Sequence, residues 1–448
     1  MLSILDNLDT CFIILIKSVK NRFYTLACMC LTFGLLGQTK EFIHKGNMNP
    51  ARLSQIDRML ETYIQNKTIN GAVAVIHRNN ELVYHKAFGY FDVETQKSMP
   101  RDAIFRIASQ TKAITATAIM QLYEEGKLLL DDPIEKYLPS FASPRVIASF
   151  NFKDTSYTTV PAKRSVTIRD LLTHTSGIGY AQIGNDTARA LYGKFGVVGG
   201  IGVTNPKIRL ADQINTLGTI PLMHQPGTKW TYGLNIDVLG RLVEVLSGQD
   251  LASFFKTRIF DPLGMNDTYF YQPASNWSRI VPLHSSSASN GIVKLPTETS
   301  MLGGLYTAYP SFKGTYFSGG AGLSCTAMDY AQFLQMMLND GIYKGKRILS
   351  RASVKLMRSN QIGDVEFIMP GQQPNNKVGF GFIITTEKAS AQSPASVGTF
   401  FGGGAFYSIY WIDPVEKITG QLMVNMLPMS DADLLEKFKV VTYQAIQD

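Results

Sequence analysis

The pattern of apolar residues sets one segment, residues 105–130, apart from the rest of the chain. An amphipathic helix carries its apolar residues on one stripe, whereas this segment is apolar almost all round its predicted helix. The apolar positions are Ala113, Ile114, Ala116, Ala118, Ile119 and Met120, followed by Leu122 and Tyr123. Gly126 provides a stop signal after them. The pattern therefore predicts a buried central helix that ends near Gly126.

Shorter periodic segments at both ends of the chain predict strands and amphipathic helices. The predicted elements are a helix at 51–69, a hairpin of strands at 71–76 and 82–88, strands at 377–386, 400–413 and 418–427, and a closing helix at 434–446. This order favours an α+β fold with one α/β sheet domain built from both chain ends, residues 50–130 and 290–448.

The middle of the chain, residues 131–289, has a different character and is predicted to form a mainly helical region. Helical patterns lie at 165–173, 236–247 and 251–260. Residues 140–163 are polar and are expected to form a loop. The glycine-rich stretch 193–202 is a plausible loop near a pocket mouth. We therefore expect a helical insertion between the two halves of the sheet domain.

The composition is that of a globular protein with an ample core: 448 residues, of which 45% are hydrophobic and 17% charged. The formal net charge is +8, but the charges are spread out, so we expect no nucleic-acid partner. The cysteines and histidines show no zinc-site spacing, and neither a metal nor an organic cofactor is implied. The absence of a G-x-S-x-G motif argues against an α/β-hydrolase nucleophile.

The first 37 residues have the layout of a signal peptide. Lys17, Lys20 and Arg22 precede the apolar run 23–36, which is shorter than the roughly 20 residues that span a bilayer. Removal of residues 1–37 leaves Cys325 as the one cysteine, so no disulfide can form within the mature chain. We expect a periplasmic or secreted protein. The alternative is an uncleaved anchor that tethers the chain to a membrane.

Candidate chemistry enters with residues 109–112, Ser-Gln-Thr-Lys, at the start of the apolar helix. Residues three apart share a helix face, so an S-x-x-K places a hydroxyl beside an amine. A serine needs a nearby base to become a nucleophile, and a lysine can be that base where its surroundings lower its pKa. A second S-x-x-K at 253–256 lies in an ordinary amphipathic pattern, which favours Ser109 as the nucleophile. The alternative is a capping serine beside a lysine whose stem covers apolar surface.

Several stretches together resemble the serine β-lactamase/penicillin-binding-protein superfamily, in its branch of esterases similar to class C β-lactamases. They are FRIASQTK, GKLLLDDPIEKYLP, TIRDLLTHTSGI, QPGTKWTYGLNIDVLGRLVEVLSG, DPLGMNDT, GGAGLSCTAMDYAQFLQMMLNDG and FFGGGAFYSIYWIDP. S-x-x-K is the nucleophile motif of this superfamily. The resemblance implies the β-lactamase/DD-peptidase-like fold, a central antiparallel sheet flanked by helices with an inserted, mainly helical region.

The resemblance also implies a catalytic tyrosine from the helical region, in a Y-x-N or Y-S-L motif. Tyr232-Gly233-Leu234 matches the first position, while the asparagine comes one residue late, at Asn235, which is kept as a substrate-binding candidate. This departure favours esterase-type members over efficient β-lactamases. A tyrosine pKa of about 10 requires a nearby cation, such as Lys112, for Tyr232 to act as a base. The alternative is an ordinary, partly buried tyrosine.

A third motif of the superfamily, K-T-G, H-x-G or W-x-G, matches Gly402, Gly403 and Gly404 in this chain. Its first residue usually helps to bind substrate, but Gly402 has no side chain, which puts recognition of a substrate carboxylate in doubt. Phe400 or Phe401 would line the pocket instead. The three glycines and Phe401 are our substrate-binding candidates, because glycines let a strand approach a substrate closely. The alternative is a strand bulge.

The resemblance further implies an oxyanion hole made by the backbone N–H groups of Ser109 and Ala405. His174 is a tempting partner for a serine nucleophile, but S-x-x-K chemistry needs no histidine, and the resemblance makes the LLTHTSG segment structural.

These residues predict a serine hydrolase that cleaves a small-molecule ester or amide through an acyl-enzyme on Ser109, most simply an esterase. Lys112 and Tyr232 would share the proton transfers. One alternative is a β-lactamase or a D-peptide-processing peptidase, with a β-lactam or peptide substrate; the missing asparagine and lysine count against it. The other alternative is a non-catalytic binding or scaffold member of the same fold.

Overall fold

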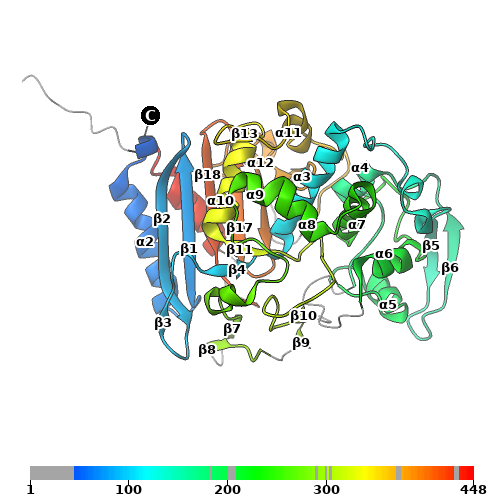
Figure 1. Ribbon diagram of the computed structural model, residues 1–448, viewed down its shortest axis with the longest axis horizontal. Helices are drawn as coiled ribbons and strands as arrows, with labels where there is room; N and C mark the ends of the chain where they lie inside the picture. Colours follow the sequence, from blue (N-terminus) through cyan, green and yellow to red (C-terminus); the bar gives the residue numbers. More distant parts are fainter. Residues whose placement is uncertain are drawn as a thin grey trace, which may run out of the picture. The chain divides into compact units, whose positions relative to one another are not determined.

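The largest sheet among the described residues has eight strands, several of which are labelled in the left half of Figure 1. The computed structural model describes residues 45–181, 183–199, 208–287, 291–297, 300–301, 305–369, 375–427 and 433–447. The strand order is β14-β15-β16-β17-β18-β1-β2-β3, and each neighbouring pair is antiparallel. The strands are β1 (Gly71–Arg78), β2 (Glu81–Asp92), β3 (Lys97–Ser98), β14 (Lys377–Val378), β15 (Ile383–Ile384), β16 (Phe400–Gly404), β17 (Ser408–Asp413) and β18 (Ile418–Met423). The predicted α+β class with an antiparallel sheet is confirmed.

The sheet joins the two ends of the chain at the β1–β18 pair, where Val73 lies opposite Met423. Strand β1 is buried on both faces, because alternate residues enter two different cores. Val73 and Val75 face one core, while Ala74 and Ile76 face the other. A strand that is covered on both sides reads as a continuous apolar run, and residues 71–76 have that pattern.

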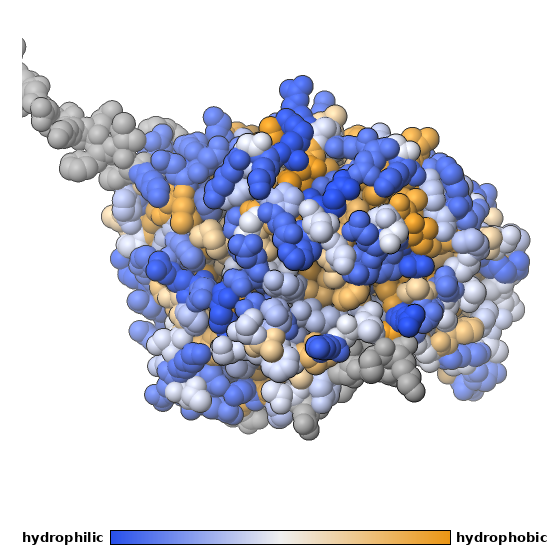
Figure 2. Space-filling view, in the orientation of Figure 1, coloured by the Kyte–Doolittle hydropathy of each residue, from blue (hydrophilic) through white to orange (hydrophobic). Residues whose placement is uncertain are grey.

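Helices cover the two faces of the sheet. Helices α2 (Pro50–Gln65) and α13 (Leu434–Tyr443) contact each other and pack against β2 and β18, at the blue and red ends of the chain in Figure 1. Helix α10 (Ala327–Leu338) packs on β1, β17 and β18 within the other core, which also contains most of helix α3 (Thr111–Glu124). Polar side chains cover much of the face seen in Figure 2, with apolar patches between them.

The remaining elements connect or extend these layers. The other helices are α4 (Ile168–Thr173), α5 (Asp186–Lys194), α6 (Leu210–Gly218), α7 (Asn235–Ser247), α8 (Leu251–Phe255), α9 (Asp261–Leu263), α11 (Arg351–Met357) and α12 (Glu387–Ser390). The short strand pairs are β4 (Ile104–Arg106) with β11 (Ser324–Thr326), β5 (Arg145–Phe150) with β6 (Tyr157–Pro161), β7 (His284–Ser287) with β8 (Gly291–Lys294), β9 (Ser300–Met301) with β10 (Leu305–Tyr306), and β12 (Ile342–Tyr343) with β13 (Lys346–Arg347). Lys45–Asp448 forms one compact unit, in which the predicted helical region 131–289 contributes α4 to α9.

Three sequence expectations were wrong in detail. The single strand expected at 400–413 is two antiparallel strands, β16 and β17, because the chain turns between Gly404 and Ser408, which lie opposite each other. The polar segment 140–163 is not a loop, because β5 and β6 form a hairpin there. Its strands are largely exposed, so they leave no apolar alternation in the sequence. The single strand expected at 377–386 is two strands, β14 and β15, since Gly381 turns the chain with a φ of 81°. That turn lies directly on α3, where an added Cβ would come within 2.9 Å of the Ala116 Cβ.

The buried central helix is confirmed. Every residue of α3 from Thr111 to Leu122 is buried, and the chain leaves the helix at Gly126 with a φ of 71°. Ser109 lies just before α3, in the single 3₁₀ turn Ala108–Gln110. The nucleophile candidate therefore sits at the helix entrance, where a side chain can remain accessible while Lys112 is held inside.

The predicted export segment, residues 1–37, lies outside the described residues, as does the last part of the glycine-rich stretch 193–202. Among the residues that the structure describes, no helix is both long enough and apolar enough to cross a membrane.

Candidate active site

The 3₁₀ turn that carries Ser109 is fixed from two sides. Ala108 has a φ of 44°, a conformation that a non-glycine residue adopts only where the surroundings enforce it, and its side chain is fully buried. Gln110 donates from Nε2 to Ser408 Oγ at 2.7 Å, and its backbone carbonyl accepts from Tyr330 Oη at 2.9 Å. The turn is thus tied to the β16–β17 end of the sheet and to α10.

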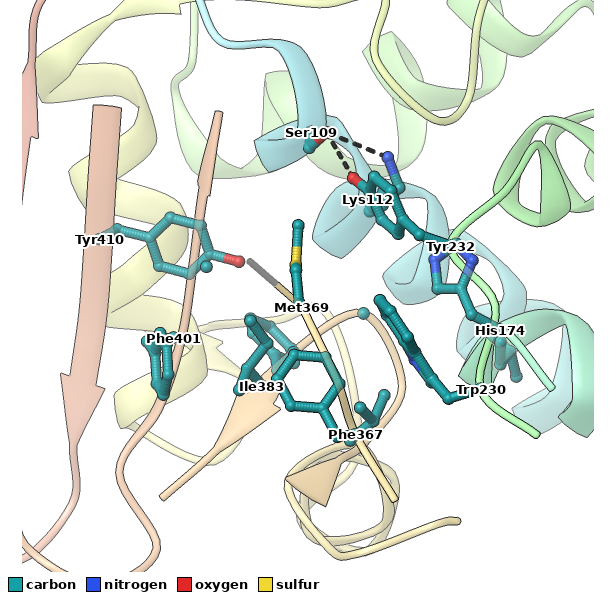
Figure 3. Close-up of a pocket in the computed structure, with 15 residues that line it drawn as sticks. Ser109, Lys112, His174, Trp230, Tyr232, Phe367, Met369, Ile383, Phe401 and Tyr410 are labelled. Atoms are coloured by element: carbon teal, nitrogen blue, oxygen red, sulfur yellow. Dashed lines mark hydrogen bonds between the residues drawn. The ribbon is translucent and has the colours of Figure 1, made fainter. Parts of the chain in front are cut away.

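The structure brings the three predicted catalytic side chains together (Figure 3). Tyr232 Oη donates to Ser109 Oγ at 2.6 Å, and Lys112 Nζ lies 3.2 Å from the same oxygen. Lys112 Nζ also lies 4.7 Å from the centroid of the Tyr232 ring. A hydroxyl with a phenol and an amine in hydrogen-bond reach has the geometry of an activated nucleophile with its base.

Lys112 makes two further contacts, so all three of its donors have an oxygen. Nζ lies 2.7 Å from the Gly320 carbonyl oxygen and 3.1 Å from Tyr180 Oη, and the side chain is buried. Three acceptors saturate an ammonium group, which has three donors and no acceptor. The buried surroundings therefore suit Lys112 as a positively charged group.

Tyr180 is a site residue that the sequence analysis missed. Burial, with Tyr232 and Asp237 close by, raises the pKa of Tyr180 well above its usual range, so Tyr180 stays a neutral phenol. Its ring centroid lies 5.1 Å from that of Tyr232. The signal in the sequence was its place two residues after the stretch TIRDLLTHTSGI, but the spacing gives no reason to place Tyr180 beside Lys112, which is distant in the chain.

Asp237 is a second missed residue, and it places a buried carboxyl group behind Lys112. It lies in the first turn of α7, is 1% exposed and accepts a hydrogen bond from Ser318 Oγ at 2.6 Å. Burial raises the pKa of Asp237, whereas the bonds from Ser318 and the Gly320 N–H and the charge of Lys112 act in the opposite direction. Gly320 thus faces the carboxylate with its N–H and Lys112 with its carbonyl.

The structure places Asn235 behind the pocket wall. Asn235 is fully buried, donates to the Ile178 carbonyl at 3.3 Å and to His174 Nδ1 at 3.0 Å, and accepts from Ser176 Oγ. With its hydrogen bonds used in this way, it is not among the residues that border the pocket. The substrate contact expected of Asn235 is therefore not what the structure shows; its position in a helix start rather than in a Y-x-N loop turns it inward.

His174 forms part of the pocket wall beside Tyr232. The two ring centroids are 5.0 Å apart, and Asn235 donates to His174 Nδ1, which leaves the proton on Nε2. Burial, with Lys112 nearby, lowers the pKa of His174 well below 6.5. This neutral imidazole packs against the Tyr232 ring and has Nδ1 bonded to Asn235, in keeping with the structural role expected for this segment.

The third motif forms β16, which packs against the Ser109 turn. Gly402 borders the pocket, while Gly403 and Gly404 continue the strand beside it. Ala405 is exposed in the turn between β16 and β17. Phe401 borders the pocket too, but its ring belongs to the core on the opposite face of the sheet, 5.3 Å from Lys439 Nζ.

The pocket around Ser109 holds a cavity of about 80 Å³ and has mainly apolar walls. Its apolar lining includes Trp230, Phe367, Met369 and Ile383, which are labelled in Figure 3, and also Leu172, Val378 and Phe382. Phe367 packs edge-on against Trp230, with their ring centroids 4.8 Å apart. In the described part of the chain, no three His, Cys, Asp or Glu side chains gather as metal ligands would. The site can therefore hold an apolar molecule of small size against the Ser109 hydroxyl.

The chain matches the sequence profile of the Beta-lactamase family over residues 56–442. The esterase EstB of Burkholderia gladioli is 30% identical over 381 residues, which cover 83% of this chain and 90% of that protein. Lovastatin esterase of Penicillium rubens is 30% identical over 408 residues, which cover 86% and 96%. The solved structure of EstCE1, described as a hydrolase with promiscuous acyltransferase activity, aligns with a TM-score of 0.75 at 26% identity and covers 88% of this chain and 99% of its own. The resemblance drawn from the motifs is confirmed, and the chain belongs to the β-lactamase family.

Proposed function

We propose that this protein is a serine esterase in which Ser109 attacks the substrate carbonyl and forms an acyl-enzyme that water then hydrolyses. The observation that carries the proposal is the convergence of Tyr232 Oη, at 2.6 Å, and Lys112 Nζ, at 3.2 Å, on Ser109 Oγ. The esterase names of two relatives and the hydrolase description of EstCE1 support the same reaction class.

In the proposed mechanism Tyr232 first gives its own proton to solvent and reacts as the phenolate, which takes the proton from Ser109 as Oγ attacks the carbonyl. Lys112 is not the base, because it uses its three donors on neighbouring oxygens and has no lone pair free while it is charged. Lys112 stabilises the phenolate of Tyr232 from 4.7 Å above the ring. The oxygen of the tetrahedral intermediate binds to the backbone N–H groups of Ser109 and Ala405, as the family resemblance implies. Tyr232 then returns the proton to the leaving alcohol.

The alternatives receive less support. A β-lactamase or D-peptide-processing peptidase has a substrate with a carboxylate, and the third motif here has glycine where a cation commonly stands. A non-catalytic scaffold has no need for a buried lysine, which is expensive to bury unless it is paired. Lys112 is 6% exposed and is hydrogen-bonded to Ser109 itself.

Labelling by a fluorophosphonate, followed by intact mass measurement, tests the proposal. We expect one adduct on the wild-type protein and none on Ser109→Ala, since only an activated serine attacks the reagent. Ser253→Ala, in the other S-x-x-K, is the matched control and should label like the wild type. Absence of an adduct on folded wild-type protein would favour the non-catalytic alternative, and an adduct that persists in Ser109→Ala would mean that another serine is the nucleophile.

Hydrolysis of a p-nitrophenyl ester beside nitrocefin separates the two enzymatic alternatives. We expect turnover of p-nitrophenyl butyrate, and loss of that turnover in Ser109→Ala. Rapid nitrocefin turnover without ester turnover would instead identify a β-lactamase.

A further inference from the structure

The glycine at the first position of the third motif has a physical explanation in its neighbour across the sheet. Gly402 of β16 pairs directly with Tyr410 of β17. A Cβ built on Gly402 would lie 2.6 Å from Tyr410 Oη and 2.9 Å from Tyr410 Cζ, closer than real contacts allow. The tyrosine ring therefore occupies the space that the Cβ of a lysine, histidine or tryptophan at position 402 would need.

The ring of Tyr410 is held firmly in this place. It is 1% exposed, and its centroid lies 5.1 Å from that of Tyr330 and 6.3 Å from that of Phe382. Burial raises the pKa of Tyr410 far above its usual range, whereas its hydrogen bond with the Tyr330 hydroxyl acts in the opposite direction, so the hydroxyl is neutral at physiological pH. A rigid phenol in a fixed position is a well-organised hydrogen-bonding group.

The hydroxyl of Tyr410 belongs to the pocket. Tyr410 borders the same cavity as Ser109, and in Figure 3 its oxygen points into the cavity from the wall opposite Trp230 and Tyr232. The part of the sheet that packs against the Ser109 turn therefore still presents a polar group to the pocket. This group belongs to β17 instead of β16, and it is uncharged.

Within the part of the chain that the structure describes, the pocket offers no free cation to a substrate carboxylate, which agrees with the neutral hydroxyl of Tyr410. Among the described side chains that border the cavity, Lys112 is the one cation, and its three donors are already used on protein oxygens. His174 is neutral because its pKa is lowered well below 6.5. A substrate carboxylate entering this apolar cavity would lose its water without gaining an ionic partner, which is strongly unfavourable. A ketone, ester or amide oxygen would need one hydrogen-bond donor, which Tyr410 has.

We propose that Tyr410 contacts the substrate in place of the missing third-motif side chain and makes the enzyme select esters with an uncharged oxygen acceptor over esters with a carboxylate. This proposal rests on the ester hydrolysis proposed above. It names the residue that sets specificity and the class of substrate that the pocket takes.

Two pairs of esters test the proposal, each differing only by a methyl ketone or a carboxylate. In the first pair the group is in the alcohol part: the butanoate esters of para-hydroxyacetophenone and para-hydroxybenzoate. In the second it is in the acyl part: the p-nitrophenyl half-ester of adipic acid and its methyl ketone analogue. We expect Tyr410→Phe to lower kcat/KM for the ketone ester of at least one pair by about fivefold to tenfold, through KM, which is the range for one neutral hydrogen bond. The carboxylate esters should change little.

The matched control is Tyr63→Phe, a tyrosine in α2 within the other core, which should leave all four substrates unchanged. Unchanged kinetics of Tyr410→Phe on both ketone esters would overturn the proposal. A fluorophosphonate adduct on wild type and variant would show in that case that the esterase site is intact. No adduct and no ester turnover in the wild type would refute the proposed function instead.

A double substitution provides the converse test. Gly402→Lys alone should lower the melting temperature, because its Cβ overlaps the Tyr410 ring. Gly402→Lys combined with Tyr410→Ala removes the overlap and places a cation in the pocket. We expect the double variant to hydrolyse the carboxylate esters at least about tenfold faster than Tyr410→Ala alone, as a charge-assisted hydrogen bond implies. A double variant that labels normally but shows no such gain would contradict the assignment.

Discussion

The chain contains the motif S-x-x-K twice, with one copy at a buried helix and the other on an exposed helix surface. Ser109 and Lys112 lie at the entrance of a buried helix, where the lysine contacts only neutral oxygens. Ser253 lies on the exposed side of α8 and donates to Asp250 Oδ2 at 2.8 Å. Lys256, also exposed, forms an ion pair with Asp261 at 2.5 Å.

The comparison shows that the spacing of the motif brings a hydroxyl and an amine to one face but does not activate them. At the second copy, the carboxylates of Asp250 and Asp261 hold the serine and the lysine in separate contacts. The hydrogen bond with Asp261 raises the pKa of Lys256, which makes it a poorer base. At the first copy, the serine and the lysine instead contact the hydroxyls of Tyr232 and Tyr180. The Asp237 carboxyl group is separated from Lys112 by Gly320, whose N–H faces the carboxyl and whose carbonyl faces the lysine.

Removal of each lysine should give the largest contrast. Lys112→Met is expected to lower kcat for p-nitrophenyl butyrate by about 100- to 10,000-fold, the usual contribution of a group that supports proton transfer in the transition state. Lys256→Met should leave kcat unchanged, because its surface ion pair has no contact with the pocket. Steady-state kinetics with circular dichroism on both variants make the comparison. Retention of more than a tenth of the rate in Lys112→Met would contradict the assigned role.

Removal of the charge behind each lysine should have a smaller effect. Asp237→Asn is expected to lower kcat by about tenfold and to move the alkaline side of the pH–rate profile to lower pH, because the buried cation loses its counter-charge. Asp261→Asn removes the carboxylate at the exposed copy and should move neither quantity. A fall in kcat for Asp237→Asn with an unmoved pH profile would indicate a purely structural role for the carboxylate.

The free energy of unfolding of the protein should depend on pH through His174, which lies beside the catalytic copy of the motif. Its pKa is lowered in the folded state, so the unfolded chain binds the extra proton once the pH falls below about 6.5, and the free energy of unfolding decreases on the acidic side. We expect a lower melting temperature at pH 5 than at pH 7.5, with a shallower pH dependence in His174→Asn. Asparagine tolerates the φ of 59° at this position. An equal slope in wild type and variant would rule out His174 as the source, whereas Ser253→Ala should keep the wild-type slope.

The smallest effect is expected at the helix cap of the second copy. Asp250 caps α8 by accepting from the Ser253 N–H at 2.8 Å. Asp250→Ala should lower the free energy of unfolding by about 1 kcal/mol, as the loss of an N-cap usually does, with no change in ester hydrolysis. Denaturant unfolding measures the first quantity. A marked loss of kcat in this variant would mean that the second copy contributes to the active site.

Much of the fold was predictable because its elements have strong local patterns. The all-round apolar pattern after Ser109 predicted α3, and the continuous apolar run 71–76 predicted β1. The hairpin β5–β6 was not predictable in this way, since exposed strands bury too few residues to leave an alternation. The split of residues 377–386 into β14 and β15 depends on the contact of Gly381 with α3, which no local pattern records.

The sequence by itself determined which residues could carry the chemistry: Ser109 and Lys112 by their spacing on one helix, and Tyr232 through the family resemblance. Only the tertiary structure decided how they are used. It brought Tyr180 and Asp237 to Lys112, turned Asn235 into the interior, and placed the Tyr410 ring over Gly402. The physical reason is that spacing acts over a few residues, whereas burial, charge and hydrogen bonding at a site depend on segments that meet only when the chain is folded.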